Sequence, residues 1–178
     1  MSVYTNSFSS TPAEVQQYIQ ALQGLAGDDK PLTVLAKADR SIRSAIRGLT
    51  KRQLARREKP GKWSIAHVIQ HLADSELVYA WRYRMILAHD KPAIQGYDQD
   101  LWADRLGYDA TDVAAALEQF RALRNANLRL LKRVKGADLD RYGVHSERGQ
   151  ESVAQLMRLN AGHDRLHLNQ IKRIRASV

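Results

Sequence analysis

Apolar side chains recur every three or four residues through most of this chain, the spacing of helices that bury one face. The pattern is clearest after Ser64, a suitable N-cap, where it runs to about His89 through Ile65, Val68, Leu72, Tyr79, Tyr83 and Ile86. Only four prolines occur among 178 residues, and strand-like alternation is rare. The sequence therefore predicts an all-α fold.

Start and stop signals divide the remaining helices. Thr11-Pro12 opens a helix that ends near Leu25, and Pro31 opens a second that ends near Gly48. Thr111 caps another that runs to about Val134, and the last spans about 151–174. Four long helices predict a four-helix bundle with a short extra N-terminal helix. We expect residues 1–29 to form an N-terminal segment packed on the bundle, and residues 30–178 to form the bundle domain.

Two stretches lack the helical pattern. Residues 90–109 contain Pro92 and two glycines and predict a loop with one short helical turn. Their aromatic residues Tyr97, Trp102 and Tyr108 lead us to expect that this loop packs across the bundle. Residues 137–149 predict a second loop.

Two histidines interrupt the apolar face of the last helix. His163 and His167 lie one turn apart on the side that carries Leu156, Leu159 and Ile171. Each buried ring nitrogen needs a partner. A hydrogen-bonded core histidine is the simpler explanation for one ring, but a metal ion would satisfy both.

The helix after Ser64 offers a second pair, His67 and His71. At about 100° per residue, His71 lies at the border of the apolar face, whereas His67 is rotated toward solvent. We therefore expect His71 to be the ligand, and His67 to be exposed or to act indirectly. Three imidazoles leave coordination positions open and leave a divalent ion its full charge. Zinc, nickel and iron all accept such a ligand set.

Several separated motifs resemble the DinB-like superfamily, in particular its YfiT-like branch. They are residues 60–65 (PGKWSI), residues 71–76 (HLADSE) with Arg82, and residues 163–171 (HDRLHLNQI). Residues 97–102 (YDQDLW) are similar to the loop of that branch. The resemblance covers roughly residues 30–175. It implies a commonly dimeric four-helix bundle with a divalent metal held by His71, His163 and His167.

Other polar residues are candidates for supporting roles. Arg82 shares a helix face with His71 and would bind a substrate carboxylate or pair with an internal acid. Four residues lie close enough along their helices to orient an imidazole: Asp74, Glu76, Asp164 and Gln170. Solvation at the helix surface is the better explanation for Asp164.

The remaining histidines and large aromatic residues have simpler explanations. His145 is read as a surface histidine, although the resemblance places its loop near the bundle mouth. His89 suits a helix end, where its cation is favourable. We expect core or interface positions for Trp63, Tyr79, Trp81 and Trp102.

Composition limits the choice of function. The chain has no cysteine, so a metal must rely on nitrogen and oxygen ligands. The net charge of +9, with Arg40, Arg43 and Arg47 on one helix face, raises a nucleic-acid partner. A solvated basic face is favoured, because no nucleic-acid-binding motif accompanies the charge. Without a long apolar run or a signal peptide, we expect a cytoplasmic protein with no membrane partner.

These observations lead to three functional hypotheses. The first is a metal-dependent, thiol-dependent S-transferase, in which the metal activates a low-molecular-weight thiol against a small-molecule substrate. The second is a metal-dependent hydrolase. The third is a non-enzymatic nucleic-acid-binding or stress-response protein with a structural metal, whose site His67 or His145 would close. The resemblance also implies a homodimer.

Overall fold

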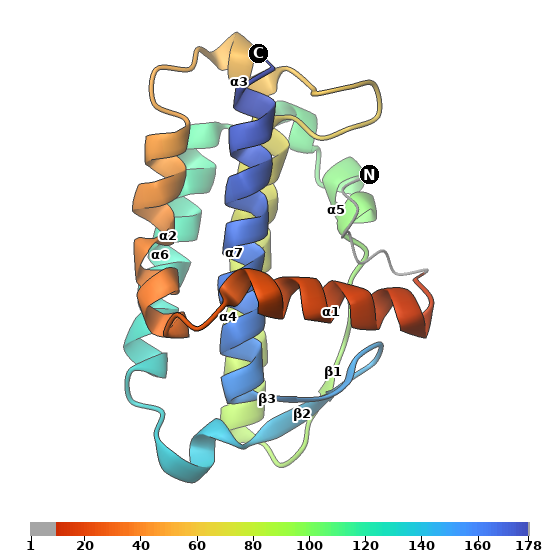
Figure 1. Cartoon of the computed structure of the whole chain (residues 1–178), viewed down its shortest axis with the longest axis vertical. Helices are drawn as coiled ribbons and strands as arrows, with labels where there is room; N and C mark the ends of the chain where they lie inside the picture. Colours follow the sequence, from red (N-terminus) through yellow and green to blue (C-terminus); the bar gives the residue numbers. More distant parts are fainter. Residues whose placement is uncertain (1–9, 178) are drawn as a thin grey trace.

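The computed structural model describes residues 10–177. Four helices run along its long axis: α2 (Pro31–Ala45), α4 (Ile65–Ala88), α6 (Val113–Leu131) and α7 (Val153–Arg175) (Figure 1). Helix α4 packs against α6 and α7, and α2 packs against the same two helices. The predicted four-helix bundle is confirmed.

Helix α1 (Pro12–Ala26) lies across α7 rather than along it (Figure 1). Its side chains Val15, Ile19 and Leu22 pack against Leu159 of α7. The crossing is close at Gly162, where an added Cβ would overlap the backbone carbonyl of Leu22. The helix begins as the sequence predicts, with a Thr11 capping box.

A layer of polar side chains divides the apolar core in two. One apolar cluster contains the beginnings of α4 and α6 and the end of α7, including Ile69, Phe120 and Ile171. The other contains the opposite ends of those helices, including Tyr83 and Leu156. Along α4, α6 and α7, the residues between these two apolar clusters include buried polar side chains. They are Asp74, Ser75, Glu76, Arg124, Asn127, His163, Asp164 and His167. The candidate site belongs to this polar layer.

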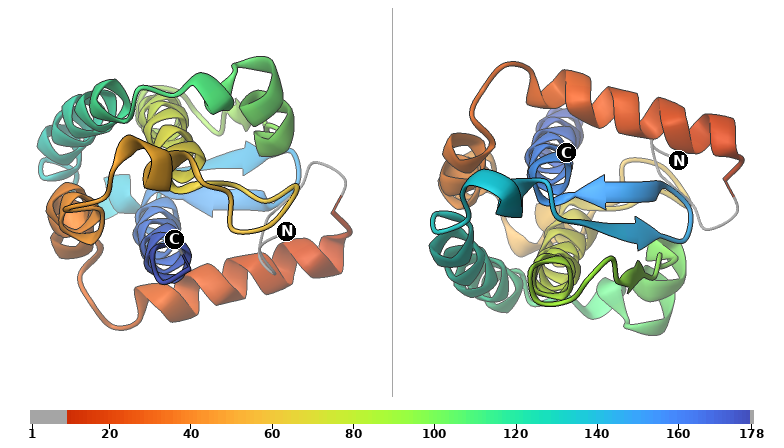
Figure 2. Two further views of the ribbon diagram at one scale, coloured as in Figure 1. Left: turned by 90° about the horizontal axis from the view of Figure 1, so that it is seen from above. Right: turned by 90° about the horizontal axis from the view of Figure 1, so that it is seen from below.

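The expectation of an irregular loop over residues 137–149 was wrong. Strands β2 (Tyr142–His145) and β3 (Gly149–Ser152) form an antiparallel hairpin, and β1 (Ala93–Ile94) pairs in parallel with β2. This small sheet lies at one end of the bundle, on the side where α4 ends and α7 begins (Figure 2). A left-handed Gly149, with φ 73°, follows the three-residue turn. Strands this short carry too little alternation for the sequence to reveal them.

Short helices complete the connections. Helix α3 (Lys51–Ala55) follows α2, and α5 (Gln99–Arg105) is the short helix expected in the loop after α4. Two 3-10 helices cover Tyr108–Ala110 and Gly136–Leu139. Tyr108 is buried against α4, as the expected packing of this loop requires. No helix within residues 10–177 is long and apolar enough to cross a membrane.

Candidate metal centre

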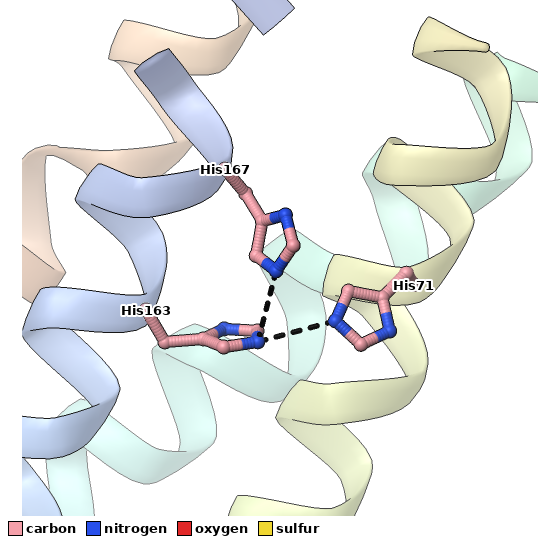
Figure 3. A group of neighbouring side chains, drawn as sticks. All are labelled: His71, His163 and His167. Carbon is pink, nitrogen blue, oxygen red and sulfur yellow. Dashed lines mark hydrogen bonds between the residues drawn. The ribbon is translucent and has the colours of Figure 1, made fainter. Parts of the chain in front are cut away.

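Three imidazoles converge inside the bundle (Figure 3). His71 comes from α4, and His163 and His167 come from successive turns of α7. The Nε2 atom of His163 lies 3.1 Å from Nε2 of His71 and 3.1 Å from Nε2 of His167. A tetrahedral ion about 2.05 Å from each nitrogen would set neighbouring nitrogens about 3.3 Å apart. The cluster therefore fits a single divalent ion.

Burial keeps these rings in the form that a metal binds. All three histidines are buried. Desolvation holds the pKa of His71 and of His163 well below the ordinary 6.5, and it lowers the pKa of His167 to about 4. The rings are therefore neutral at pH 7, and no proton has to leave before an ion binds.

Neighbouring side chains fix two of the rings. His167 donates its Nδ1–H to Oε1 of Gln170 at 2.8 Å, which leaves the Nε2 lone pair facing the cluster. The expected role of Gln170 is thus confirmed. The Trp63 ring lies 4.9 Å from the His71 ring, between centroids, and shields it.

Two hydroxyls stand at the edge of the cluster. The Oγ atom of Ser75 lies 3.3 Å from Nε2 of His71 and 2.9 Å from the hydroxyl of Tyr97. Burial raises the pKa of Tyr97, so its phenol is neutral at pH 7. Sequence analysis missed Ser75, although its position one turn after His71 was a usable signal.

Neither of the other two candidate histidines joins the cluster. The surface position expected for His145 and the exposed alternative for His67 were both wrong. His67 is buried: its Nδ1 lies 2.7 Å from Ser64 Oγ, and its Nε2 lies 3.1 Å from Asp109. His145 is buried on β2, where Nδ1 accepts the backbone N–H of Glu147 and desolvation lowers its pKa to about 2. Helical phase placed His67 outward because it ignored the covering loop segments. His89 is the exposed C-cap of α4.

The acidic candidates bind other groups than imidazoles. Asp164 was expected at the solvated surface, but it is buried and accepts two hydrogen bonds from Arg124, at 2.6 and 3.0 Å. Glu76 accepts from the same guanidinium at 2.7 Å. Asp74 accepts from the hydroxyl of Tyr108 at 2.6 Å. None of the three orients a histidine in the described structure.

Arg124 connects all four helices of the bundle and was missed by sequence analysis. From α6 it donates to Glu76 on α4, to Asp164 on α7 and, at 3.0 Å, to the carbonyl of Leu35 on α2. Burial alone would lower its pKa, but the two carboxylates hold it well above the ordinary value. This cation and its two acids together hold the polar layer around the histidines.

A narrow pocket opens beside the cluster. It offers about 50 Å³ to water-sized groups, and its lining includes His163, Ser75, Tyr79, Arg82 and Tyr97. Arg82 is buried, so the inward orientation expected from helical phase is confirmed. Its Nη2 donates to the carbonyl of Gln95 at 3.2 Å, and it forms no ion pair with a described residue. The alternative in which Arg82 pairs with an internal acid was therefore wrong within residues 10–177.

The aromatic candidates divide between core and surface. Tyr79 is buried and Trp63 packs against the apolar core, as expected. Trp102 is half-buried against Tyr97, with ring centroids 4.4 Å apart. Trp81 is 63% exposed, so of its two expected positions, core or interface, the core is ruled out. It lies on the outer face of α4.

The basic face on α2 is partly neutralised. Arg43 pairs with Asp39 and with Glu118, each at 2.9 Å. Arg40 and Arg47 are exposed. Of the three arginines on this face, Arg43 is therefore held in ion pairs.

Comparison with known proteins agrees with the fold and the site. A relative from Oceanobacillus iheyensis is 28% identical over 132 residues, which are 74% of this chain and 76% of the relative. Another from Bacillus mycoides is 26% identical over 147 residues, which are 83% and 84% of the two chains. Both are named provisionally as metal-dependent hydrolases. Together with the buried three-histidine cluster, these relatives point to a divalent metal ion.

A solved structure shares the architecture. YfiT from Bacillus subtilis, described as having an unusual four-helix bundle topology, aligns with a TM-score of 0.73 and 21% identity over 96% of this chain and 91% of its own. The sequence profile of the DinB superfamily matches residues 35–171, which include His71, His163 and His167. The chain belongs to the DinB superfamily.

Proposed function

We propose that this chain is a metal-dependent hydrolase in which His71, His163 and His167 hold one divalent ion. The observation that carries the proposal is the convergence of three buried, neutral imidazoles, one of which, His163, lines a pocket. The provisional names of the relatives support hydrolysis as the reaction. A bound ion would act there as a Lewis acid toward a small nucleophile.

The chain's own side chains supply binding and orientation. Gln170 fixes the His167 ring, and Trp63 keeps water from the outer face of His71. The hydroxyls of Ser75 and Tyr97 lie where they would donate hydrogen bonds to an oxygen of the substrate. Their 2.9 Å contact lets one hydroxyl orient the other.

Transfer of a low-molecular-weight thiol is the second candidate. Within residues 10–177, hydroxyls rather than a carboxylate lie against the histidine cluster, and the raised pKa of Tyr97 makes its phenol a poor base at neutral pH. A thiol loses its proton near pH 8.5 and needs less help than water does. Because the chain has no cysteine, such a thiol would come from solution.

Activity of the reconstituted protein tests both candidates. The protein is stripped with a chelator, reloaded separately with zinc, nickel or iron(II), and assayed with ester, amide and lactone substrates and with thiols plus electrophilic acceptors. We expect metal-dependent hydrolysis that is lost in His163→Ala and retained in His67→Ala. Turnover only with thiol and acceptor would replace hydrolysis by thiol transfer. Turnover that survives His163→Ala would contradict both.

A further inference from the structure

Arg82 is a buried cation in the pocket that opens onto the histidine cluster. It lies on α4, 11 residues and three turns after His71, and therefore on the same helix face. Its exposure is only 5%. The same pocket is lined by Ser75 and His163. One pocket therefore joins a histidine of the cluster to the guanidinium of Arg82.

The charge of Arg82 lacks a counter-ion among the described residues. The neighbouring Arg148 is satisfied, because it holds Glu151 in a bidentate pair with a 2.9 Å contact between Nη2 and Oε2. Among residues 10–177, Arg82 donates only to the Gln95 carbonyl, and its buried Nε has no hydrogen-bond partner there. Desolvation and the adjacent Arg148 lower the pKa of Arg82, which shows that its environment disfavours the charge.

The carboxylate of Glu147 also lines this pocket but does not pair with Arg82. Its Oε1 packs over Gly96, where an added Cβ would overlap it, and Glu147 has an interaction of its own. Each oxygen of Glu151 accepts a hydrogen bond from Arg148, and Glu151 forms no ion pair with Arg82. A buried guanidinium without a paired acid lowers the stability of the fold. Proteins commonly retain such a destabilising residue where it serves to bind a ligand.

The pocket selects the kind of anion. A guanidinium presents Nε and Nη donors in a planar fork that matches the two oxygens of a carboxylate. The free volume of about 50 Å³ accommodates a group of a few atoms, such as a carboxylate. Tyr79, Tyr97 and Gln99 also line this space, which favours a small planar anion over a bulky phosphorylated group.

We propose that Arg82 is the specificity-determining residue of this site, and that it binds a carboxylate of the substrate while the reacting group lies at the three-histidine cluster. The inference rests on the proposed function, since it names the substrate class of the same site. The substrate is a carboxylic acid derivative whose carboxylate binds Arg82 while its reactive bond reaches the cluster, three helical turns back along α4.

Anion-dependent stability of the metal-free protein tests the role of Arg82 without an enzyme assay. Unfolding midpoints are measured in sodium chloride, acetate and inorganic phosphate at equal ionic strength. At acetate about ten times its Kd, the wild-type midpoint should rise by roughly 3–6 °C over chloride. The rise should vanish in Arg82→Gln and shrink in Arg82→Lys, which keeps the charge but loses the fork.

Arg84→Gln is the matched control, because Arg84 lies on the same helix, is exposed and does not line the pocket. It should keep the full acetate effect. Arg82→Gln should also be at least as stable as wild type in chloride, since it removes an unpaired buried charge. A clearly lower unfolding midpoint of Arg82→Gln in chloride would show that Arg82 is structural and would overturn the proposal. If Arg82→Gln does not fold, Arg82→Lys takes its place. An acetate effect in Arg82→Lys equal to that of wild type would then overturn the proposal.

Metal titration of the same samples separates this inference from the proposed function. If wild type binds one metal ion but acetate has no effect, or phosphate has an equal one, the carboxylate assignment is wrong and the metal site stands. If no metal binds, the proposed function falls and the substrate role of Arg82 falls with it. Acetate binding through Arg82 together with metal binding supports both.

Discussion

Arg124 donates two hydrogen bonds, of 2.6 and 3.0 Å, to Asp164, the residue that directly follows His163. The same guanidinium reaches Glu76 on α4. The two helices that carry the histidines are therefore fastened to one buried cation. The polar layer holds the site in place. Its contribution to the free energy of unfolding can be measured separately from metal binding.

Removal of this cation should strongly destabilise the fold. Arg124→Met leaves two buried carboxylates, Glu76 and Asp164, without their cation, and we expect a loss of about 3–5 kcal/mol in the free energy of unfolding. Arg121→Met is the control, because Arg121 forms only an exposed pair with Glu118 and should cost at most about 1 kcal/mol. Urea unfolding measures both. Similar small losses in the two variants would show that the buried pairs contribute little.

The crossing of α1 over α7 should tolerate no side chain at Gly162. In Gly162→Ala the new Cβ would overlap the Leu22 carbonyl, so we expect a loss of roughly 1–3 kcal/mol. Gly24→Ala on α1 is the control, since no atom lies within 4 Å of its added Cβ. It should stabilise the protein by roughly 0.5–1 kcal/mol through helix propensity. Thermal unfolding that ranks the variants in the opposite order would contradict this packing.

Gln170 should affect metal affinity more than stability. Gln170→Ala removes the acceptor that fixes the His167 ring, and we expect a 10–100-fold weaker metal complex. Asn169→Ala changes an exposed neighbour on the same turn and should leave affinity unchanged. Competition with a chromophoric chelator measures both constants. Equal affinities in the two variants would remove Gln170 from the site.

Much of this architecture follows from local sequence patterns. The helices and the inward positions of His71, His163 and Arg82 depend on spacing within one helix, which periodicity reports. The periodicity of one helix carries no information on the partners that other segments of the chain bring to it. Asp164 was assigned to solvent because its cation lies 40 residues away on α6, and His67 because Asp109 covers it from another loop.

Acid should destabilise the metal-free protein through its buried histidines. The pKa of His167 is about 4 in the folded state and near 6.5 when unfolded, so between those pH values only the unfolded state binds the proton. Stability therefore falls as the pH drops from 6.5 toward 4, by up to about 1.4 kcal/mol per pH unit for this residue. His167→Gln should lose less stability over that interval than wild type. Parallel stability curves for the two proteins would contradict the assignment.

Metal content tests the central claim most directly. Wild type, His71→Ala and His67→Ala are purified, loaded with the same divalent metal, desalted and analysed for metal per chain. The account predicts one ion per chain in wild type and in His67→Ala, and almost none in His71→Ala. Wild type without metal, or a His71→Ala variant that retains a full equivalent, would contradict it.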